Sequence, residues 1–200
     1  MGIYGFFKSF YGLKNIPFTH CDLVVPLGYG LLNHNKLPDA SEKTLREAVK
    51  IANQYQAPIV WANVNYLWPE CAEAENRLKT EKARLAGLTS APIIVQGVTN
   101  SVTEAQNIRL TLEQTSISIL QSKTIIVVAD WPHARSARMI WREVFPESTV
   151  IIKSIYGRWN EHHPCFFQRS ESRWLIINLI RHLALIILTA EGISRFRQPK

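Results

Sequence analysis

The densest group of reactive side chains in the sequence directly follows an apolar run that ends at Ala129. Asp130 and His133 come first, and Arg135 and Arg138 follow three residues apart. The imidazole of His133 titrates near neutral pH and could act as a general acid or base, with Asp130 beside it as a second catalytic candidate. The arginines share one helix face, where they could hold a phosphate or carboxylate. In the alternative interpretation, Asp130 caps the helix and the arginines are solvated.

A pair of glycines follows an earlier apolar run, in the segment Gly28-Tyr29-Gly30. Glycines at a strand end let backbone N–H groups approach a phosphate or carboxylate, so we expect these three residues to contact a ligand. Asn33 stands where the dinucleotide fingerprint has its third glycine, and the next helix begins only near Asp39. NAD binding is therefore disfavoured, and a purely structural glycine turn is the alternative.

A third polar group opens a helix at Ser101-Val-Thr-Glu104. This spacing is that of a capping box, which predicts that Ser101 and Glu104 satisfy backbone groups of the first helical turn. Thr103 and Asn107 are four residues apart and could reach the same ligand.

These groups need a scaffold, and apolar runs rich in Ile and Val supply it by alternating with helical patterns. Such runs are typical of strands covered on both faces of a parallel sheet. The sequence therefore predicts an α/β fold, a Rossmann-like and mostly parallel sheet of about five strands with helices on both faces. In that architecture ligands bind beyond the carboxyl ends of the strands. The predicted strands span residues 22–27, 58–64, 92–95, 124–129 and 149–152.

Helical patterns fill the intervals, and each has a start or stop signal. The helix after the first strand is preceded by Asp39-Ala-Ser-Glu42, which has capping-box spacing, and the helix after the fourth strand is stopped by Pro146. The stretch 70–88 is a highly charged helix with a poorly defined apolar face.

The most hydrophobic stretch, residues 174–190, carries Asn178, Arg181 and His182 at its middle. A charge at the centre of a membrane costs about 2.5–3.5 kcal/mol on insertion scales, so a docked C-terminal helix at about 171–191 is favoured over a membrane anchor. Residues 1–18 lack the pattern of a secretory signal and are expected to pack on the domain surface.

Composition limits the remaining possibilities. The chain has 200 residues, 46% of them hydrophobic and 20% charged, which suits a single domain. Its three cysteines show no CxxC spacing, so neither disulfides nor zinc are indicated and a cytoplasmic location is expected. A net charge of +7 favours an anionic partner. His162 and His163 beside Glu161 lack a third ligand and are interpreted as surface histidines, so no metal site is expected.

Four stretches, which span residues 20–155 in order, resemble the YdcF/SanA/ElyC-like family of bacterial proteins. They are Asp22-Leu-Val-Val-Pro-Leu-Gly28-Tyr-Gly30, the helix around Ala74-Glu75, Ser101-Val-Thr-Glu-Ala-Gln-Asn107 and Ile125-Ile-Val-Val-Ala-Asp130-Trp-Pro-His-Ala-Arg-Ser-Ala-Arg138. The resemblance implies a Rossmann-like sheet, a polar cleft for a nucleotide-like ligand such as S-adenosylmethionine, and a role at the cell envelope. The chain departs from the family pattern at Tyr29, in the Thr103 to Asn107 spacing, and at Ser136, where an arginine often follows the histidine.

The favoured hypothesis is a protein that binds a small anionic, nucleotide-like ligand at the strand ends. A nucleic-acid-binding module is an alternative, because aromatic and basic residues adjoin at Arg158-Trp159 and Arg173-Trp174. A peripheral membrane scaffold without catalysis is another, based on the apolar C-terminal helix and the basic residues after it. Neither alternative is favoured by the sequence.

Overall fold

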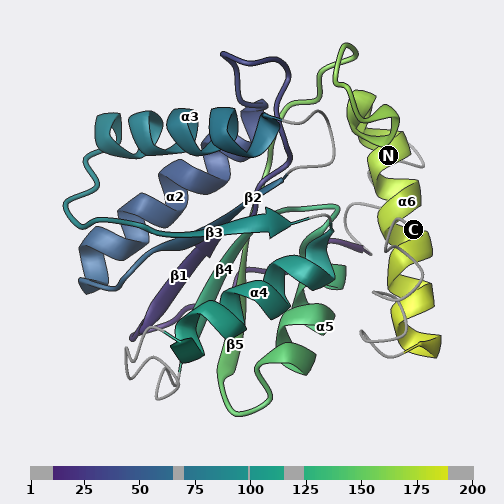
Figure 1. The fold of residues 1–200 in the computed structure, drawn as a ribbon. Coiled ribbons are helices and arrows are strands. Elements are labelled where there is room, and N and C mark those ends of the chain that lie inside the picture. The colour runs from purple at the N-terminus through teal and green to yellow at the C-terminus, as the bar shows by residue number, and fades with distance from the viewer. Residues whose placement is uncertain (1–10, 65–69, 99, 115–123, 189–200) are drawn as a thin grey trace.

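The computed structural model describes residues 11–64, 70–98, 100–114 and 124–188. Strands and helices alternate along the chain (Figure 1). The strands are β1 (Leu23–Pro26), β2 (Val60–Val64), β3 (Ile93–Val98), β4 (Thr124–Asp130) and β5 (Thr149–Ile155). The helices are α2 (Asp39–Tyr55), α3 (Cys71–Leu85), α4 (Ser101–Gln114), α5 (Ala134–Val144), the 3₁₀ turn η2 (Phe166–Arg169) and α6 (Glu171–Ile187). Each predicted strand is confirmed, with its ends shifted by a few residues.

All strand pairs are parallel. β1, β4 and β5 form one ladder and β2 and β3 another, and a bridge between Val24 and Ile59 joins them. The spatial order is therefore β3-β2-β1-β4-β5, which matches the first five strands of the Rossmann order 3-2-1-4-5-6. Strands β2 and β3 extend the sheet on one side of β1, and β4 and β5 extend it on the other side. The strand order therefore reverses between β1 and β4, and in such folds ligands bind at the carboxyl ends of the two strands where this reversal occurs.

Side-chain alternation along the strands supplies a core for both faces of the sheet. On β1, Leu23 and Val25 pack with α4 and α5, whereas Val24 packs with α2 and α3. Helices thus cover both faces, and the predicted Rossmann-like α/β class is confirmed (Figure 1).

Helix starts differ from the predicted capping boxes. The side-chain oxygen of Asn100 accepts N–H bonds from Val102 and Thr103, at 2.9 and 3.1 Å, so Asn100 caps α4. Glu104 is then free of the capping role and is buried. At the start of α2, the capping position belongs to Pro38, which gives no side-chain cap. Both capping-box predictions were wrong. The predicted capping residues, Asp39 and Ser101, are the first residues inside their helices, and the capping position is the residue before each of them.

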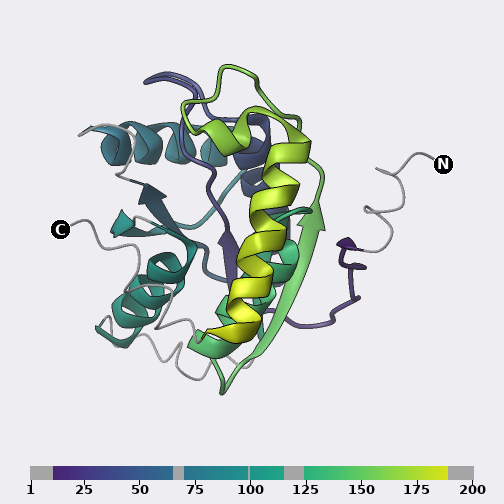
Figure 2. The same ribbon diagram turned by 90° about the vertical axis from the view of Figure 1, so that its right-hand side faces the viewer.

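The C-terminal helix α6 packs against α5. Ser170 caps α6, and Glu171 accepts a hydrogen bond from the indole of Trp131 at 2.7 Å. Farther along, the Tyr11 hydroxyl donates to the carbonyl of Asn178 at 3.2 Å. Figure 2 shows α6 lying across one side of the molecule. In the part of the chain that the structure describes, no helix is long and apolar enough to cross a membrane.

A close approach at Gly157 ties the segment after β5 to the start of α2. A Cβ atom at Gly157 would lie 2.6 Å from the Cβ and 2.7 Å from the Cα of Ala40. We expect Gly157→Ala to lower the free energy of unfolding by about 3 kcal/mol, because the backbone of α2 must shift to admit a methyl group. Urea denaturation measures this loss. Gly87→Ala, which meets no atom within 4 Å at a φ of +87°, should cost only about 1 kcal/mol. Equal losses in the two variants would refute the steric explanation.

Candidate functional site

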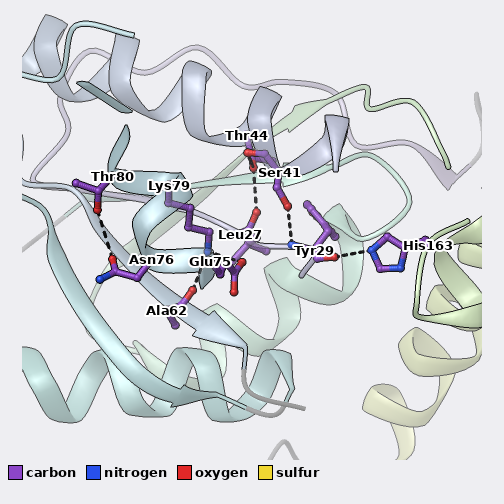
Figure 3. A network of polar contacts seen from close by, with 10 residues as sticks. All are labelled: Leu27, Tyr29, Ser41, Thr44, Ala62, Glu75, Asn76, Lys79, Thr80 and His163. Atoms are coloured by element: carbon purple, nitrogen blue, oxygen red, sulfur yellow. Dashed lines mark hydrogen bonds and ion pairs between the residues drawn. The ribbon is translucent and has the colours of Figure 1, made fainter. Parts of the chain in front are cut away.

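The loops that follow β1 and β4 lie side by side, because these strands are neighbours in the sheet. Tyr29 joins the two loops through both its side chain and its backbone. Its hydroxyl accepts the N–H of Asp130 at 2.6 Å, and its own N–H donates to the hydroxyl of Ser41 at 2.9 Å. Its carbonyl accepts the Nε2–H of His163 at 3.0 Å (Figure 3). Tyr29 therefore connects the end of β1 to the end of β4, to α2 and to the segment that contains His163. Its side chain is buried.

His133 lies at the start of α5 and is 2% exposed. Its Nε2 atom is 3.2 Å from the hydroxyl of Ser101 and 3.4 Å from the guanidinium of Arg181. A guanidinium only donates hydrogen bonds, so Nε2 carries the lone pair and Nδ1 carries the proton. Burial, and then the charge of Arg181, hold the pKa of His133 well below its usual value. His133 is consequently a neutral acceptor at physiological pH.

Ser101 and Arg181 complete a polar group contributed by three helices. Ser101 begins α4, His133 precedes α5, and Arg181 comes from the middle of α6. Ser101 and Arg181 are both partly exposed, so solvent reaches this group from the outside. Trp174 lies beneath it, with ring centroids 5.8 Å from His133 and 5.9 Å from Tyr29. The guanidinium of Arg181 and the hydroxyl of Ser101 therefore both lie beside His133, whose ring packs against Trp174.

Asp130, the second catalytic candidate, faces away from this group. Its Oδ1 atom accepts the N–H of Gly157 at 3.0 Å, and its buried Oδ2 atom has no hydrogen-bond partner. The buried Nδ1 atom of His133 also has none, so the two side chains are not paired in the structure. Burial raises the pKa of Asp130 to about 7, which the backbone N–H of Gly157 partly offsets. The structure gives no Asp–His dyad here.

A second polar cluster surrounds Gly28, and the sequence analysis did not predict it. Lys79 forms an ion pair with Glu75 at 2.9 Å and donates to the carbonyl of Ala62 at 2.8 Å (Figure 3). Their side chains are only 2% and 0% exposed. A Cβ at Gly28 would lie 2.7 Å from the Lys79 ammonium nitrogen and 2.8 Å from Glu75 Oε1. Gly28 thus lacks a side chain because this ion pair occupies the space.

Glu104 completes the cluster around Gly28. It is 6% exposed. Burial raises the pKa of its carboxyl group to about 8, and the nearby Lys79 and, to a smaller extent, the backbone N–H of Gly28 partly offset that rise. Gly30 has a left-handed backbone, with a φ of 73°, which explains a glycine there.

Asn63, at the carboxyl end of β2, is fully buried, and among the residues that the structure describes neither its amide oxygen nor its amide nitrogen has a hydrogen-bond partner. Such a group is rare in folded proteins and calls for an explanation, such as a bound molecule or water. The sequence did not single it out.

The other predicted ligand contacts lie outside the His133 group. Arg135 donates to the carbonyl of Tyr11 and lies over its ring. Arg138 is half-buried on α5, where burial and the charges of Arg142 and Arg135 lower its pKa. The hydroxyl of Thr103 donates to the carbonyl of Asn100. The structure brings together the loops of Gly28 and His133 as predicted, but it places these side chains elsewhere. Asn107 is partly exposed on α4.

The paired histidines also differ from the sequence interpretation. His162 is exposed, whereas His163 is buried and accepts the N–H of Cys165 at 3.0 Å on its Nδ1 atom. The surface assignment was therefore wrong for His163, whose partner across the fold is the backbone of Tyr29. Within the described residues, no group of three or more His, Cys, Asp or Glu side chains could hold a metal ion.

Among the surface cavities that the described residues line, three have volumes of about 420, 260 and 210 Å³. The first and third border α3, and the second lies between the start of α2 and the segment around Arg158. His133 lines none of the three. Trp174 of α6 packs against Tyr29 and His133, which follow β1 and β4, so a ligand above these strands would enter beside Ser101 and Arg181 or displace α6.

No protein-family model, no curated protein and no solved structure matches the chain.

Proposed function

We propose that this protein binds a small anionic, nucleotide-like ligand at the carboxyl ends of β1, β2 and β4. The observation that carries the proposal is the convergence of Ser101, His133 and Arg181 beside the position where the strand order reverses. Arg181 supplies positive charge, and Ser101 supplies a hydroxyl at the N-terminus of α4, where the helix dipole favours an anion. Asn63 supports a ligand with an uncharged polar part, because its buried amide offers both a donor and an acceptor at the end of β2.

The resemblance to the YdcF/SanA/ElyC-like family agrees with this proposal and suggests S-adenosylmethionine as one ligand to test. It also suggests a bacterial origin and a role at the cell envelope, which we include in the proposal. A nucleic-acid-binding role has less support, because Trp174, one of its two aromatic candidates, is buried in the core.

The geometry favours binding over a bond-making step. A serine hydroxyl that donates to a neutral imidazole is the arrangement of a nucleophile and its general base. Proton transfer from Ser101 to His133 would create a buried imidazolium beside Arg181, and both burial and that charge oppose it. We therefore assign His133 the role of holding Ser101 and Arg181 in place.

The proposal predicts that Arg181→Gln weakens ligand binding. Calorimetric titration of the full chain with adenine nucleotides and S-adenosylmethionine would identify the ligand. For that ligand, the loss of a charged hydrogen bond should raise Kd by at least tenfold, or about 1.4 kcal/mol. Arg138→Gln, an arginine of α5 outside this group, is the matched control and should leave Kd unchanged. Absence of binding across the panel, or equal effects of the two variants, would reject the proposed site.

A further inference from the structure

One face of α6 is apolar and exposed. Ile176, Ile180, Leu183 and Ile187 are 58%, 56%, 52% and 82% exposed. Their spacing of four, three and four residues places them in one stripe along the helix. The opposite face is also largely apolar and packs on the domain, through Trp174, Leu175 and Leu185. A helix with apolar residues on two opposite faces is normally covered on both of them.

Aromatic side chains extend the stripe beyond the start of the helix. Phe166 and Phe167, in η2, are 54% and 44% exposed. The guanidinium of Arg173 lies 4.3 Å from the centre of the Phe166 ring. Exposed apolar side chains therefore occur from η2 to the end of α6, the helix that lies across the front of Figure 2. Exposed apolar patches of this kind mark interaction surfaces.

The charge beside the stripe is positive. Helix α5 packs against α6 and carries Arg135, Arg138 and Arg142. Arg135 and Arg138 are close enough to His182 of α6 to lower its pKa, after burial as the larger cause. In the described part of the chain no carboxylate pairs with Arg138, and α6 has no acidic residue after Glu171.

The exposed apolar stripe and the positive charge beside it favour one of two possible binding partners, a second copy of the chain or an anionic membrane surface. A second copy of the chain, packed α6 against α6, would bring like charges together and lose stability. A membrane surface with anionic headgroups attracts the same arginines while the apolar side chains enter the interface. We propose that the exposed face of α6 docks the protein on an anionic lipid surface. The helix would lie flat, because its 17 residues span only about 26 Å at 1.5 Å per residue.

Vesicle co-sedimentation of the full chain tests this proposal. We expect binding to vesicles of phosphatidylcholine mixed with phosphatidylglycerol, weaker binding at high salt, and little binding to phosphatidylcholine alone. The variant Ile180→Ser/Leu183→Ser should reduce the vesicle partition coefficient at least tenfold. Leu110→Ser, an equally exposed residue of α4 at 53%, is the matched control and should retain binding.

A second variant separates charge from apolar contact. Arg138→Gln/Arg142→Gln should lower the partition coefficient on anionic vesicles while leaving the stripe intact. Failure of the native chain to bind anionic vesicles would overturn the proposal. A dimer in light scattering that Ile180→Ser/Leu183→Ser converts to a monomer would also overturn it, in favour of a second copy. These readouts are independent of the titrations of the strand-end site.

Discussion

Replacing Lys79 with alanine is expected to lower the free energy of unfolding by about 3–5 kcal/mol, the usual cost of removing one partner of a buried ion pair. The Lys79 ammonium group lies between Glu75 and the carbonyl of Ala62, at 2.9 and 2.8 Å. Its removal leaves the carboxylate of Glu75 in a site with no exposed side-chain surface. The loss is measured by urea denaturation near neutral pH.

Two further variants identify the cause of that loss. Lys43 forms a pair of the same spacing and length with Asp39, at 2.9 Å, but both side chains are more than a third exposed, so Lys43→Ala should cost about 0.5 kcal/mol or less. The double variant Glu75→Leu/Lys79→Met should recover most of the stability, because apolar side chains of similar volume avoid the desolvation cost. An equal loss for Lys79→Ala and Lys43→Ala would show that burial of the pair is not the cause.

The same ion pair explains why the sequence was least informative in α3. Apolar periodicity reveals a helix when its buried face is apolar, but the buried face of α3 includes Glu75 and Lys79. A Glu and a Lys four residues apart are far more often a solvated pair. The sequence feature that reflects the buried pair is Gly28, because the absence of a side chain there leaves space for Glu75 and Lys79.

The strands were predictable for the opposite reason. Both faces of the parallel sheet are covered by helices, so each strand must be almost uniformly apolar. A run such as Ile125-Ile-Val-Val is typical of such a buried strand. Alternation with helices predicted the parallel sheet, and the strand order seen in the structure places the loops of Gly28 and His133 together. Individual contacts did not follow, because His133 meets Ser101 and Arg181 from 32 and 48 residues away. The polar residues within the apolar sequence of α6 indicated that this helix packs on the domain. They did not indicate that Arg181 would contact His133.

Helix α6 links the two proposals through its opposite faces. Trp174 and Arg181 face the strand ends, whereas Ile180 and Leu183 face outward. A ligand that displaced α6 from His133 would also move the outer face. Binding of ligand and of vesicles can therefore be coupled, and by linkage each would change the affinity for the other by the same factor.

The stability of the protein is expected to fall as the pH rises from 6.5 to 8.5. Folding raises the pKa of Asp130 to about 7 and that of Glu104 to about 8, mainly through burial. Over this range the unfolded chain has already released both protons, whereas the folded chain still holds part of them. Each retained proton makes the free energy of unfolding decrease by about 1.4 kcal/mol per pH unit. The stabilisation is complete below the unfolded values near pH 4 and is lost as the pH passes 7 and then 8.

Glutamine at position 104 isolates the larger contribution to this pH dependence. Glu104→Gln keeps an oxygen for the N–H of Gly28 but cannot ionise, so its stability should decrease by about 2 kcal/mol less than that of the native chain between pH 6.5 and 8.5. Glu81→Gln, on the exposed side of α3, should leave the native slope unchanged. Buried histidines act in the opposite direction at the low end of this range, because an unfolded histidine, with a pKa of about 6.5, still binds part of a proton there whereas buried His133 does not; this contribution is the same in both chains. A slope in Glu104→Gln as steep as that of the native chain would mean that Glu104 is ionised in the folded protein, in which case Lys79 would balance two carboxylates instead of one.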